Sequence, residues 1–343
     1  MIMIYTKTPF RMSFFGGGTD IPEYFEEHGG AVLSTTFDKY CYVSVRHLPG
    51  FFEYRNQLTY SKIERVQSAD EFEHPMVRGA MKHLNMRDLY IGYDADLPAR
   101  SGLGSSSSFA VGLLNAFHAL KGHYASKEQL AKEAIYVERE LCAESGGWQD
   151  QIAAAYGGMN RITFSSGGFE VTPVIIQKER KEQLNQNLML FFTGFSRFAS
   201  ELEKEKVKTI RDKTTELREI AQLVNAGEAV LTDRHGDLDE FGRLLHHAWQ
   251  LKRGIGKGVS TSALDNIYQT AMQHGAIGGK LLGAGGGGFF VFYVPKEMQA
   301  SVQRALSNLI YIPFHFEGSG TQVLYYEPED YDMALAKAKT EKI

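Results

Sequence analysis

The stretch that most constrains this chain is "DADLPARSGLGSSSSFAVGLLNAFHAL", residues 94–120, in which glycines and four consecutive serines lead into an apolar segment. Serine is unfavourable inside a helix, because its hydroxyl competes for backbone hydrogen bonds, but it is favoured where a helix begins. Apolar residues follow at positions 109, 111, 113, 114 and 117. The pattern predicts a helix over Ser105–Leu120 whose N-terminus is built from glycine and serine.

A helix N-terminus of this kind favours the binding of an anion, most often a phosphate. It carries about half a positive charge and several N–H groups that lack helical partners. Gly102 and Gly104 would let a ligand come close to the backbone, and the serine hydroxyls can cap the helix, bind phosphate oxygens or hold Mg²⁺. Neither a Walker A motif nor a nucleophile elbow occurs here. An elaborate N-cap with a structural role alone is the alternative.

A second glycine-rich loop, "GAGGGG", spans Gly283–Gly288 and formally satisfies the pattern G-x-G-x-x-G. A dinucleotide-binding site needs a strand before this pattern and a helix after it. Here the strand-like segment "FFVFYV" follows the loop, so we reject a Rossmann site, and a dehydrogenase would rest on this motif alone. Five glycines in six positions predict a close backbone approach to another loop or to a ligand.

Four charged residues accompany these loops in the sequence. Arg11 lies on an apolar strand that breaks at Gly16–Gly18, and Asp20 follows. Asp150 lies near the start of a short helix, and Glu138 lies on the helix before it. Taken singly, an Arg–Asp salt bridge or an aspartate N-cap explains such residues. Taken together, they match phosphoryl transfer, which needs positioning, Mg²⁺ and a carboxylate that accepts the hydroxyl proton.

Composition indicates a folded chain with few other constraints on function. The 343 residues are 43% hydrophobic and 23% charged, which predicts two domains or one large α/β unit. A net charge of −4 gives no reason to expect nucleic acid or a membrane surface as a partner. No apolar run approaches a bilayer span, no signal-peptide pattern is present, and two cysteines make no disulfide framework. We therefore expect a cytoplasmic protein.

The order of the predicted elements suggests two domains, 1–183 and 184–343. Strands and helices alternate up to the paired strands that we expect at 159–166 and 169–176. Charged helices are predicted at 201–231 and 237–253. The last third then predicts a small α+β sandwich, in which "YIPFHFEGSGTQVLYY" forms two strands across a Gly-Ser-Gly turn.

Three segments, in chain order, resemble the motifs of the GHMP small-molecule kinases: "TPFRMSFFGGGTD", "LPARSGLGSSSS" and "KLLGAGGGGFF". The second contains P-x-x-x-G-L-G-S-S, the most specific of the three. The stretch "SFFGGGTDIPEYFEEHGGAVLSTTFDKYCYV", with "QDQIAAAYGG" and "TGFSR", is similar to the branch that phosphorylates D-glycero-D-manno-heptose 7-phosphate. "GGGTD" replaces the "GEHTD" of galactokinases, which argues against galactose.

The resemblance implies an α+β, two-domain GHMP kinase fold. Residues 1–183 would resemble the second domain of ribosomal protein S5, and residues 184–343 would form a ferredoxin-like sandwich that carries the 283–288 loop. ATP would lie against the 102–108 loop with Mg²⁺, and a small sugar phosphate would occupy the cleft between the domains. The product would be a heptose 1,7-bisphosphate. A kinase for fucose or another hexose, a non-catalytic sugar or nucleotide sensor, and a homodimer all remain open.

The resemblance also implies roles for individual residues. Asp150 would be the catalytic base, and Arg11 would lower the pKa of the acceptor hydroxyl and hold Asp150 ionised. Ser106, with Ser105 as its competitor, would bind Mg²⁺ together with Glu138. The ATP-binding set would be Pro98, Ser101, Gly102, Leu103, Gly104, Ser105, Ser106 and Ser107. The substrate-binding set would be Gly17, Gly18, Asp20, Gly285 and Gly286. Candidates for binding a phosphate on the substrate are Arg78, Arg197 and Lys280.

Overall fold

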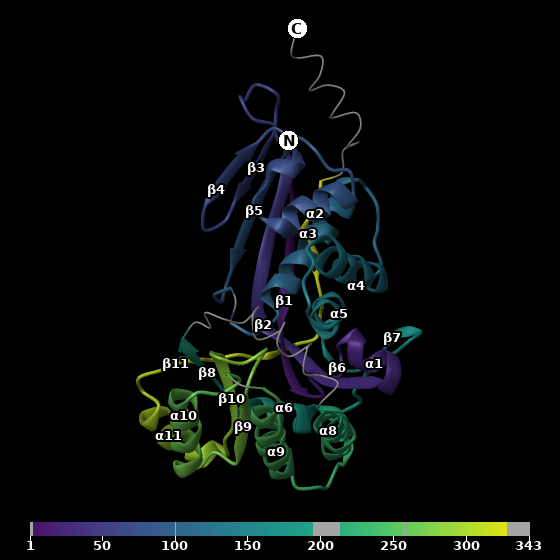
Figure 1. The fold of residues 1–343 in the computed structure, drawn as a ribbon. Helices are drawn as coiled ribbons and strands as arrows, with labels where there is room; N and C mark the ends of the chain where they lie inside the picture. The colour runs from purple at the N-terminus through teal and green to yellow at the C-terminus, as the bar shows by residue number, and fades with distance from the viewer. Residues whose placement is uncertain (1–2, 100, 195–212, 257, 328–343) are drawn as a thin grey trace.

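The computed structural model describes residues 3–99, 101–194, 213–256 and 258–327, which form two β-sheets and the helices that pack on them (Figure 1). The strands of the large sheet are β1 (Met3–Phe15), β2 (Gly30–His47), β3 (Asn56–Thr59), β4 (Ile63–Val66), β5 (Leu89–Ala95), β6 (Met159–Ser165), β7 (Gly168–Pro173), β12 (Phe316–Glu317) and β13 (Gln322–Tyr325). The strands of the small sheet are β8 (Leu188–Gly194), β9 (Gly278–Leu281), β10 (Gly288–Tyr293) and β11 (Ile310–Ile312).

The helices fall into two groups in chain order, before and after β8. Those before the small sheet are α1 (Pro22–His28), α2 (Pro75–His83), α3 (Ser105–Leu120), α4 (Lys127–Tyr136), α5 (Gln149–Tyr156) and α6 (Lys178–Asn187). Those after β8 are α8 (Thr214–Thr232), α9 (Asp239–Ile255), α10 (Ser262–Gln273) and α11 (Gln299–Ala305). Across the described ranges, no helix combines the length and the apolar character that a bilayer crossing requires.

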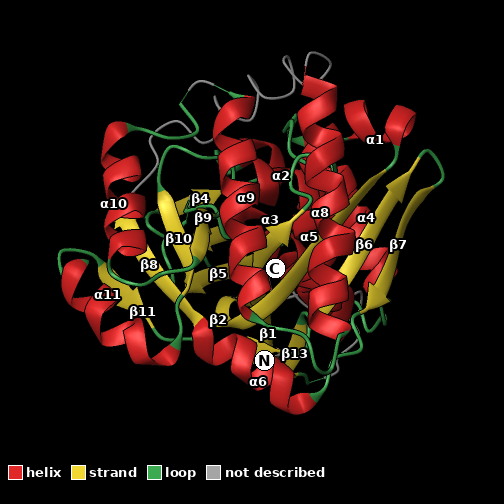
Figure 2. Ribbon diagram, turned by 90° about the horizontal axis from the view of Figure 1, so that it is seen from below, coloured by secondary structure: helices red, strands yellow, loops and turns green. Residues whose placement is uncertain are grey.

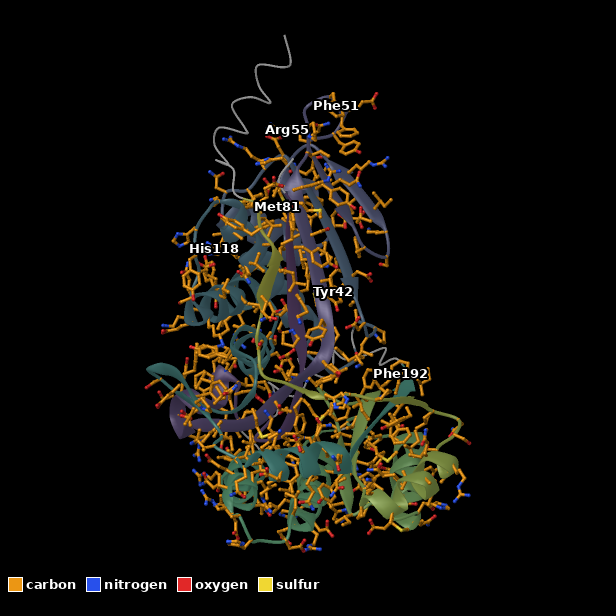
Figure 3. All side chains as sticks on the ribbon, turned by 180° about the vertical axis from the view of Figure 1, so that it is seen from behind. Tyr42, Phe51, Arg55, Met81, His118 and Phe192 are labelled. Carbon is orange, nitrogen blue, oxygen red and sulfur yellow. The ribbon has the colours of Figure 1, made fainter. Side chains whose placement is uncertain are left out.

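The long antiparallel pair of β1 and β2 is the spine of the molecule, and α2 to α5 cover one face of its sheet (Figure 1). Figure 3 shows Met81 and His118 on this helical side, whereas Tyr42 lies on the sheet. The predicted helix α3 lies against β1, with Thr6 Oγ1 donating to Gly112 O at 3.0 Å and Ser108 Oγ to Pro9 O at 2.9 Å. These bonds fix the start of α3 beside the centre of β1.

The small sheet has the strand order β11-β8-β10-β9, and every pair is antiparallel. In chain order these are the fourth, first, third and second strands, which is the arrangement of a ferredoxin-like sandwich. Its apolar core gathers Trp249 from α9 and Tyr268 from α10 against Phe290 and Phe292 of β10. The predicted α+β sandwich is therefore confirmed.

Helices α8 and α9 lie side by side (Figure 2). One continuous apolar core contains residues of both helices and of both sheets. Phe14 and Phe15, at the end of β1, make edge-to-face contacts with Phe241 of α9 at ring-centre distances of 5.1 and 5.2 Å. Such pairs contribute about 0.5–1.5 kcal/mol each beyond the area they bury. This shared core fixes the end of β1 against the C-terminal part of the chain.

The strands predicted on either side of the Gly-Ser-Gly turn do not pair with each other. β11 joins β8 in the small sheet, whereas β12 pairs with β2 and β13 with β1 in the large sheet. The turn instead packs on the end of α5, where a Cβ on Gly157 would lie 2.0 Å from Gly320 N. Strands are thus present on both sides of the turn, as predicted, but they join different partners because these glycines serve a contact between distant segments.

Because β12 and β13 belong to the large sheet, the predicted domain boundary does not coincide with the division between the two sheets. A cut at residue 183 falls inside α6, and it leaves two strands of the large sheet in the later part of the chain. A single cut therefore does not separate the two sheets. Of the predicted helix 201–231, the structure describes α8 from Thr214, and residues 201–212 lie outside the described ranges.

The two glycine-rich loops pack directly against each other. A Cβ on Gly102 would lie 2.5 Å from Leu282 O, and a Cβ on Gly283 would lie 2.3 Å from Gly102 Cα. Both glycines also have positive φ, at 83° and 76°. Glycine is needed here because neither the close approach nor the backbone conformation tolerates a side chain. The close approach predicted for the second loop is confirmed.

Replacing Gly283 with alanine should lower stability more than replacing Gly122, a glycine of similar φ (67°) with open space around its Cβ position. The Gly122→Ala variant should lose about 1 kcal/mol from left-handed strain alone. The Gly283→Ala variant adds a backbone clash and should lose roughly 3 kcal/mol. Urea unfolding measures both values. Equal losses would contradict the tight contact between the loops.

Candidate active site

A cleft of about 990 Å³ opens where the two glycine loops meet. Its walls come from distant parts of the chain: Arg11 of β1, the start of α3, Asp150 of α5 and Lys280 of β9. A volume near the upper end of the usual range for small-molecule sites suits a nucleotide together with a second small molecule.

Arg11 and Asp150 form a two-pronged ion pair in this cleft. Arg11 Nε donates to Asp150 Oδ1 and its second terminal nitrogen to Asp150 Oδ2, both at 2.7 Å, and its other terminal nitrogen donates to Gly102 O at 2.7 Å. The Arg11 side chain is 5% exposed, whereas that of Asp150 is 23% exposed. The carboxylate is therefore held rigidly on one side and reaches the cleft on the other.

The N-terminus of α3 lies beside this ion pair. Gly104 is the N-cap residue, has φ of 74° and has no side chain with which to cap the first N–H groups. A Cβ on Gly104 would lie 3.3 Å from Asp150 Oδ2, so the carboxylate is close to the helix end. This end attracts anions, and a phosphate bound there would lie next to Asp150.

Asp20 is buried and pairs with backbone groups. Its Oδ1 accepts from Gly18 N at 2.8 Å, and its Oδ2 accepts from Gln149 N at 3.4 Å. A Cβ on Gly147 would lie only 1.9 Å from Asp20 Oδ2. The simple Arg11–Asp20 salt bridge is thus not formed, and Asp20 instead holds the segment that leads into α5.

Glu138 is positioned by an irregularity in its helix. After α4, the residues Val137–Leu141 form a π-helical turn, a feature often found at functional sites. Glu138 Oε2 accepts from Ser107 Oγ at 2.9 Å and from Gln151 Nε2, whereas its buried Oε1 has no partner among the described residues. Burial, with a contribution from the charge of Asp150, raises the Glu138 pKa to about 8, against the lowering effect of these two bonds.

The cleft also has an aromatic end that sequence reasoning missed. Tyr60, His74, Phe109 and Tyr93 line it, and their rings contact one another in that order at centre distances of 5.4, 5.3 and 4.7 Å. These residues come from four separate segments, so no local pattern could have grouped them. Phe109 directly follows the four serines and lies about one helical turn after Ser105, which places the aromatic end beside the start of α3.

Comparison with known proteins identifies similar sequences over most of this chain. The family "GHMP kinases N terminal domain" matches residues 64–158, and "GHMP kinases C terminal" matches residues 220–311. The D-glycero-alpha-D-manno-heptose 7-phosphate kinase of Campylobacter jejuni is 30% identical over 321 residues, which cover 89% of this chain and 94% of that protein.

The chain belongs to the GHMP kinase family.

More distant relatives share parts of this similarity. The bifunctional fucokinase/GDP-fucose pyrophosphorylase of Arabidopsis thaliana is 26% identical over 87% of this chain, which spans 30% of that longer protein. A D-glycero-D-manno-heptose 1-phosphate kinase structure from Bacteroides thetaiotaomicron has a TM-score of 0.71 at 24% identity and covers 95% of this chain and all of its own. Lactococcus lactis galactokinase has a TM-score of 0.71 at 16% identity, with 94% and 95% covered. These structures confirm the two-domain GHMP kinase fold.

The structure brings most of the predicted site residues of this GHMP kinase into the cleft, and their roles remain predictions. Those that line it are Arg11, Gly17, Asp20, Gly102, Gly104, Ser105, Ser106, Ser107, Glu138, Asp150 and Lys280. Those that are absent from its lining are Gly18, Pro98, Ser101, Leu103, Gly285 and Gly286.

Five of these six absences have a physical reason in the structure. Ser101 Oγ donates to Pro98 O at 2.6 Å, and Leu103 is fully buried, so these residues support the loop before α3 from behind. Gly285 and Gly286 pack on Val259, since Gly286 N donates to Val259 O at 3.1 Å and a Cβ on Gly285 would lie 2.8 Å from Val259 Cα.

The two other basic candidates are also accounted for. Arg78 donates to Phe72 O at 2.7 Å and does not line the cleft. Arg197 lies outside the described residues.

The residues around Glu138 fit a magnesium ion. A buried carboxylate oxygen without a partner, beside serine hydroxyls and an anion site, provides the oxygen ligands that Mg²⁺ prefers. Among the residues with described positions, no group of three or more His, Cys, Asp or Glu side chains forms a closed metal cage. Ser107 lies against Glu138, whereas Ser106 is more exposed.

Replacing Arg11 with alanine should destabilise the protein more than replacing Arg55. Arg55 makes an equally short two-pronged pair with Asp88, at 2.6 and 2.7 Å, but its side chain is 46% exposed and lies at the end of the molecule far from the small sheet (Figure 3). We expect the Arg11→Ala variant to lose about 2–3 kcal/mol, because it leaves a partly buried carboxylate unpaired, and the Arg55→Ala variant at most about 1 kcal/mol. Urea unfolding compares the two, and an equal loss would contradict a buried structural role for Arg11.

Proposed function

We propose that this GHMP kinase transfers the γ-phosphate of ATP to the anomeric hydroxyl of D-glycero-D-manno-heptose 7-phosphate, giving the 1,7-bisphosphate. The observation that carries the proposal is the Arg11–Asp150 pair, which holds a carboxylate beside the anion-binding end of α3. The similarity over most of its length to a heptose 7-phosphate kinase supports this choice of acceptor.

We infer one orientation for ATP in the cleft. Its adenine would lie at the aromatic end formed by Tyr60, His74, Phe109 and Tyr93. Its triphosphate would then follow the start of α3, where the N–H groups and the helix dipole stabilise negative charge. The γ-phosphate would end next to Asp150, and the lack of a side chain on Gly104 keeps the backbone accessible beside that carboxylate.

Asp150 is the group placed to accept the proton of the acceptor hydroxyl. As the anomeric oxygen attacks the γ-phosphorus, its proton passes to an Asp150 carboxylate oxygen, and the bond between the γ-phosphorus and the β–γ bridging oxygen breaks to release ADP. Arg11 holds both carboxylate oxygens and so fixes their direction. Its guanidinium also places positive charge next to the developing negative charge on the acceptor oxygen.

Mg²⁺ would be held by Glu138 with a neighbouring serine hydroxyl, Ser106 in the sequence prediction or Ser107 beside the carboxylate. When bound, the ion would neutralise charge on the β- and γ-phosphates. The residues of this chain position it: Gln151 and Ser107 hold one oxygen of Glu138, and the other is left for the metal. A sensor without activity would not require a base and a metal-binding carboxylate in one cleft.

Replacing Asp150 with asparagine should lower kcat by a factor of about 10² or more, because asparagine cannot accept the hydroxyl proton. ATP binding should remain close to that of the wild type, since the end of α3 is unchanged. The measurements are phosphate transfer from labelled ATP to heptose 7-phosphate, with calorimetry for ATP binding.

The control for the choice of acceptor is a panel that also contains fucose, mannose and galactose. Wild-type turnover should be highest with heptose 7-phosphate. A higher kcat/KM for fucose or another unphosphorylated hexose would replace the proposed acceptor. ATP binding without transfer to any sugar would indicate a sensor instead, and an active Asp150→Asn variant would remove the base assignment.

A further inference from the structure

We propose that Ser13, Lys252 and Lys280 form a subsite that binds a phosphate group already present on the acceptor. The inference rests on the proposed function, because it concerns the second substrate of the same cleft. All three side chains line this cleft, and they come from β1, α9 and β9. The subsite therefore combines the large sheet with the C-terminal part of the chain.

Ser13 is the first observation. It lies two residues after Arg11 on β1, and its hydroxyl is buried without a hydrogen-bond partner among the described residues, although the residue lines the cleft. The residue is only 6% exposed. A buried hydroxyl without a partner is costly, so such groups mark places where a ligand or water completes the bonding.

Gln149 supports the same position. Its Oε1 is also buried without a partner in the described part of the chain. A Cβ placed on Gly17 would lie 3.7 Å from both Ser13 Oγ and Gln149 Nε2, so these two polar groups flank one point of the cleft wall. Glycine at position 17 leaves that point open, and a ligand there could contact both groups.

The two lysines add positive charge next to Ser13. Lys280 is 6% exposed and its ammonium donates to Phe14 O at 2.8 Å, which places it one residue from Ser13. Lys252 donates to Leu281 O at 2.7 Å and to Gly283 O at 2.5 Å, which places it beside Lys280 and the second glycine loop. Ammonium groups and a hydroxyl donor together match the oxygens of a phosphate monoester.

The position relative to Asp150 also suits such an acceptor. Arg11, which holds Asp150, and Phe14, which holds Lys280, are three residues apart on β1, or roughly 10 Å along an extended strand. A seven-carbon sugar bridges a separation of this order between its anomeric oxygen and a terminal phosphate. Among the described residues, the two arginines that line the cleft are already paired, Arg11 with Asp150 and Arg139 with Glu23.

The test compares Ser13→Ala and Lys280→Met with the wild type on phosphorylated and unphosphorylated acceptors. Ser13→Ala should fold normally, because it removes a buried hydroxyl that has no partner. Each variant should raise KM for heptose 7-phosphate roughly tenfold, the effect of losing one hydrogen bond to a charged group. kcat and the KM for ATP should stay within about twofold of the wild type, since only acceptor binding is affected.

Lys127→Met is the matched control. Lys127 also donates to a backbone carbonyl, that of Tyr156 at 2.7 Å, but it does not line the cleft. This variant should leave KM for heptose 7-phosphate unchanged. A Ser13→Ala variant that keeps the wild-type ratio of kcat/KM between heptose 7-phosphate and heptose would overturn the inference.

A panel that adds mannose 6-phosphate and fucose separates this inference from the proposed function. If the wild type phosphorylates mannose 6-phosphate but not heptose 7-phosphate, and both variants lose that preference, the subsite stands and the proposed acceptor is wrong. If the wild type prefers heptose 7-phosphate and both variants keep that preference, the proposed function stands and the subsite is wrong. A wild-type preference for unphosphorylated sugars overturns both.

Discussion

The interaction on which the rest of the site depends is the set of three hydrogen bonds made by Arg11. Two reach the carboxylate of Asp150 and the third reaches Gly102 O. One buried side chain thus connects β1 to α5 and to the loop before α3. Without this cation, the partly buried carboxylate of Asp150 would lack its charge partner, which would lower the stability of the fold. The same bonds that stabilise the fold therefore give Asp150 its direction and place it beside the end of α3.

The two glycine-rich loops supply the second constraint. Their backbones approach so closely at Gly102 and Gly283 that a side chain on either would clash with the other loop. The loop around Gly102 is thereby supported by the C-terminal part of the chain, and residues from both sheets line the cleft. The shared core at Phe14, Phe15 and Phe241 fixes the same relation from the far end of β1. The positions of the cleft residues are therefore fixed by packing between the N-terminal and C-terminal parts of the chain.

The sequence predicted the local features of this site well and the distant ones poorly. The bounds of α3 followed from glycine and serine before an apolar run, because capping and propensity are local. The destination of β12 and β13 did not, since strand pairing depends on segments far apart in the chain. The aromatic end near Phe109 was missed for the same reason, because its residues come from separate segments. The π-helical turn at Glu138 is a local irregularity that no residue pattern in the sequence indicated. The contact between Ser107 and Glu138 could not be predicted either, because it depends on which face of α3 points toward Glu138.

The central claim is that a nucleoside triphosphate binds at the start of α3 with its γ-phosphate facing a carboxylate that Arg11 holds. A crystal structure with Mg²⁺ and a non-hydrolysable ATP analogue tests it most directly. The account predicts phosphate oxygens on the backbone N–H groups of the loop from Gly102 to Ser107, with Asp150 next to the γ-phosphate and still paired with Arg11. A triphosphate bound elsewhere, or an Asp150 carboxylate turned away from it, would contradict the account.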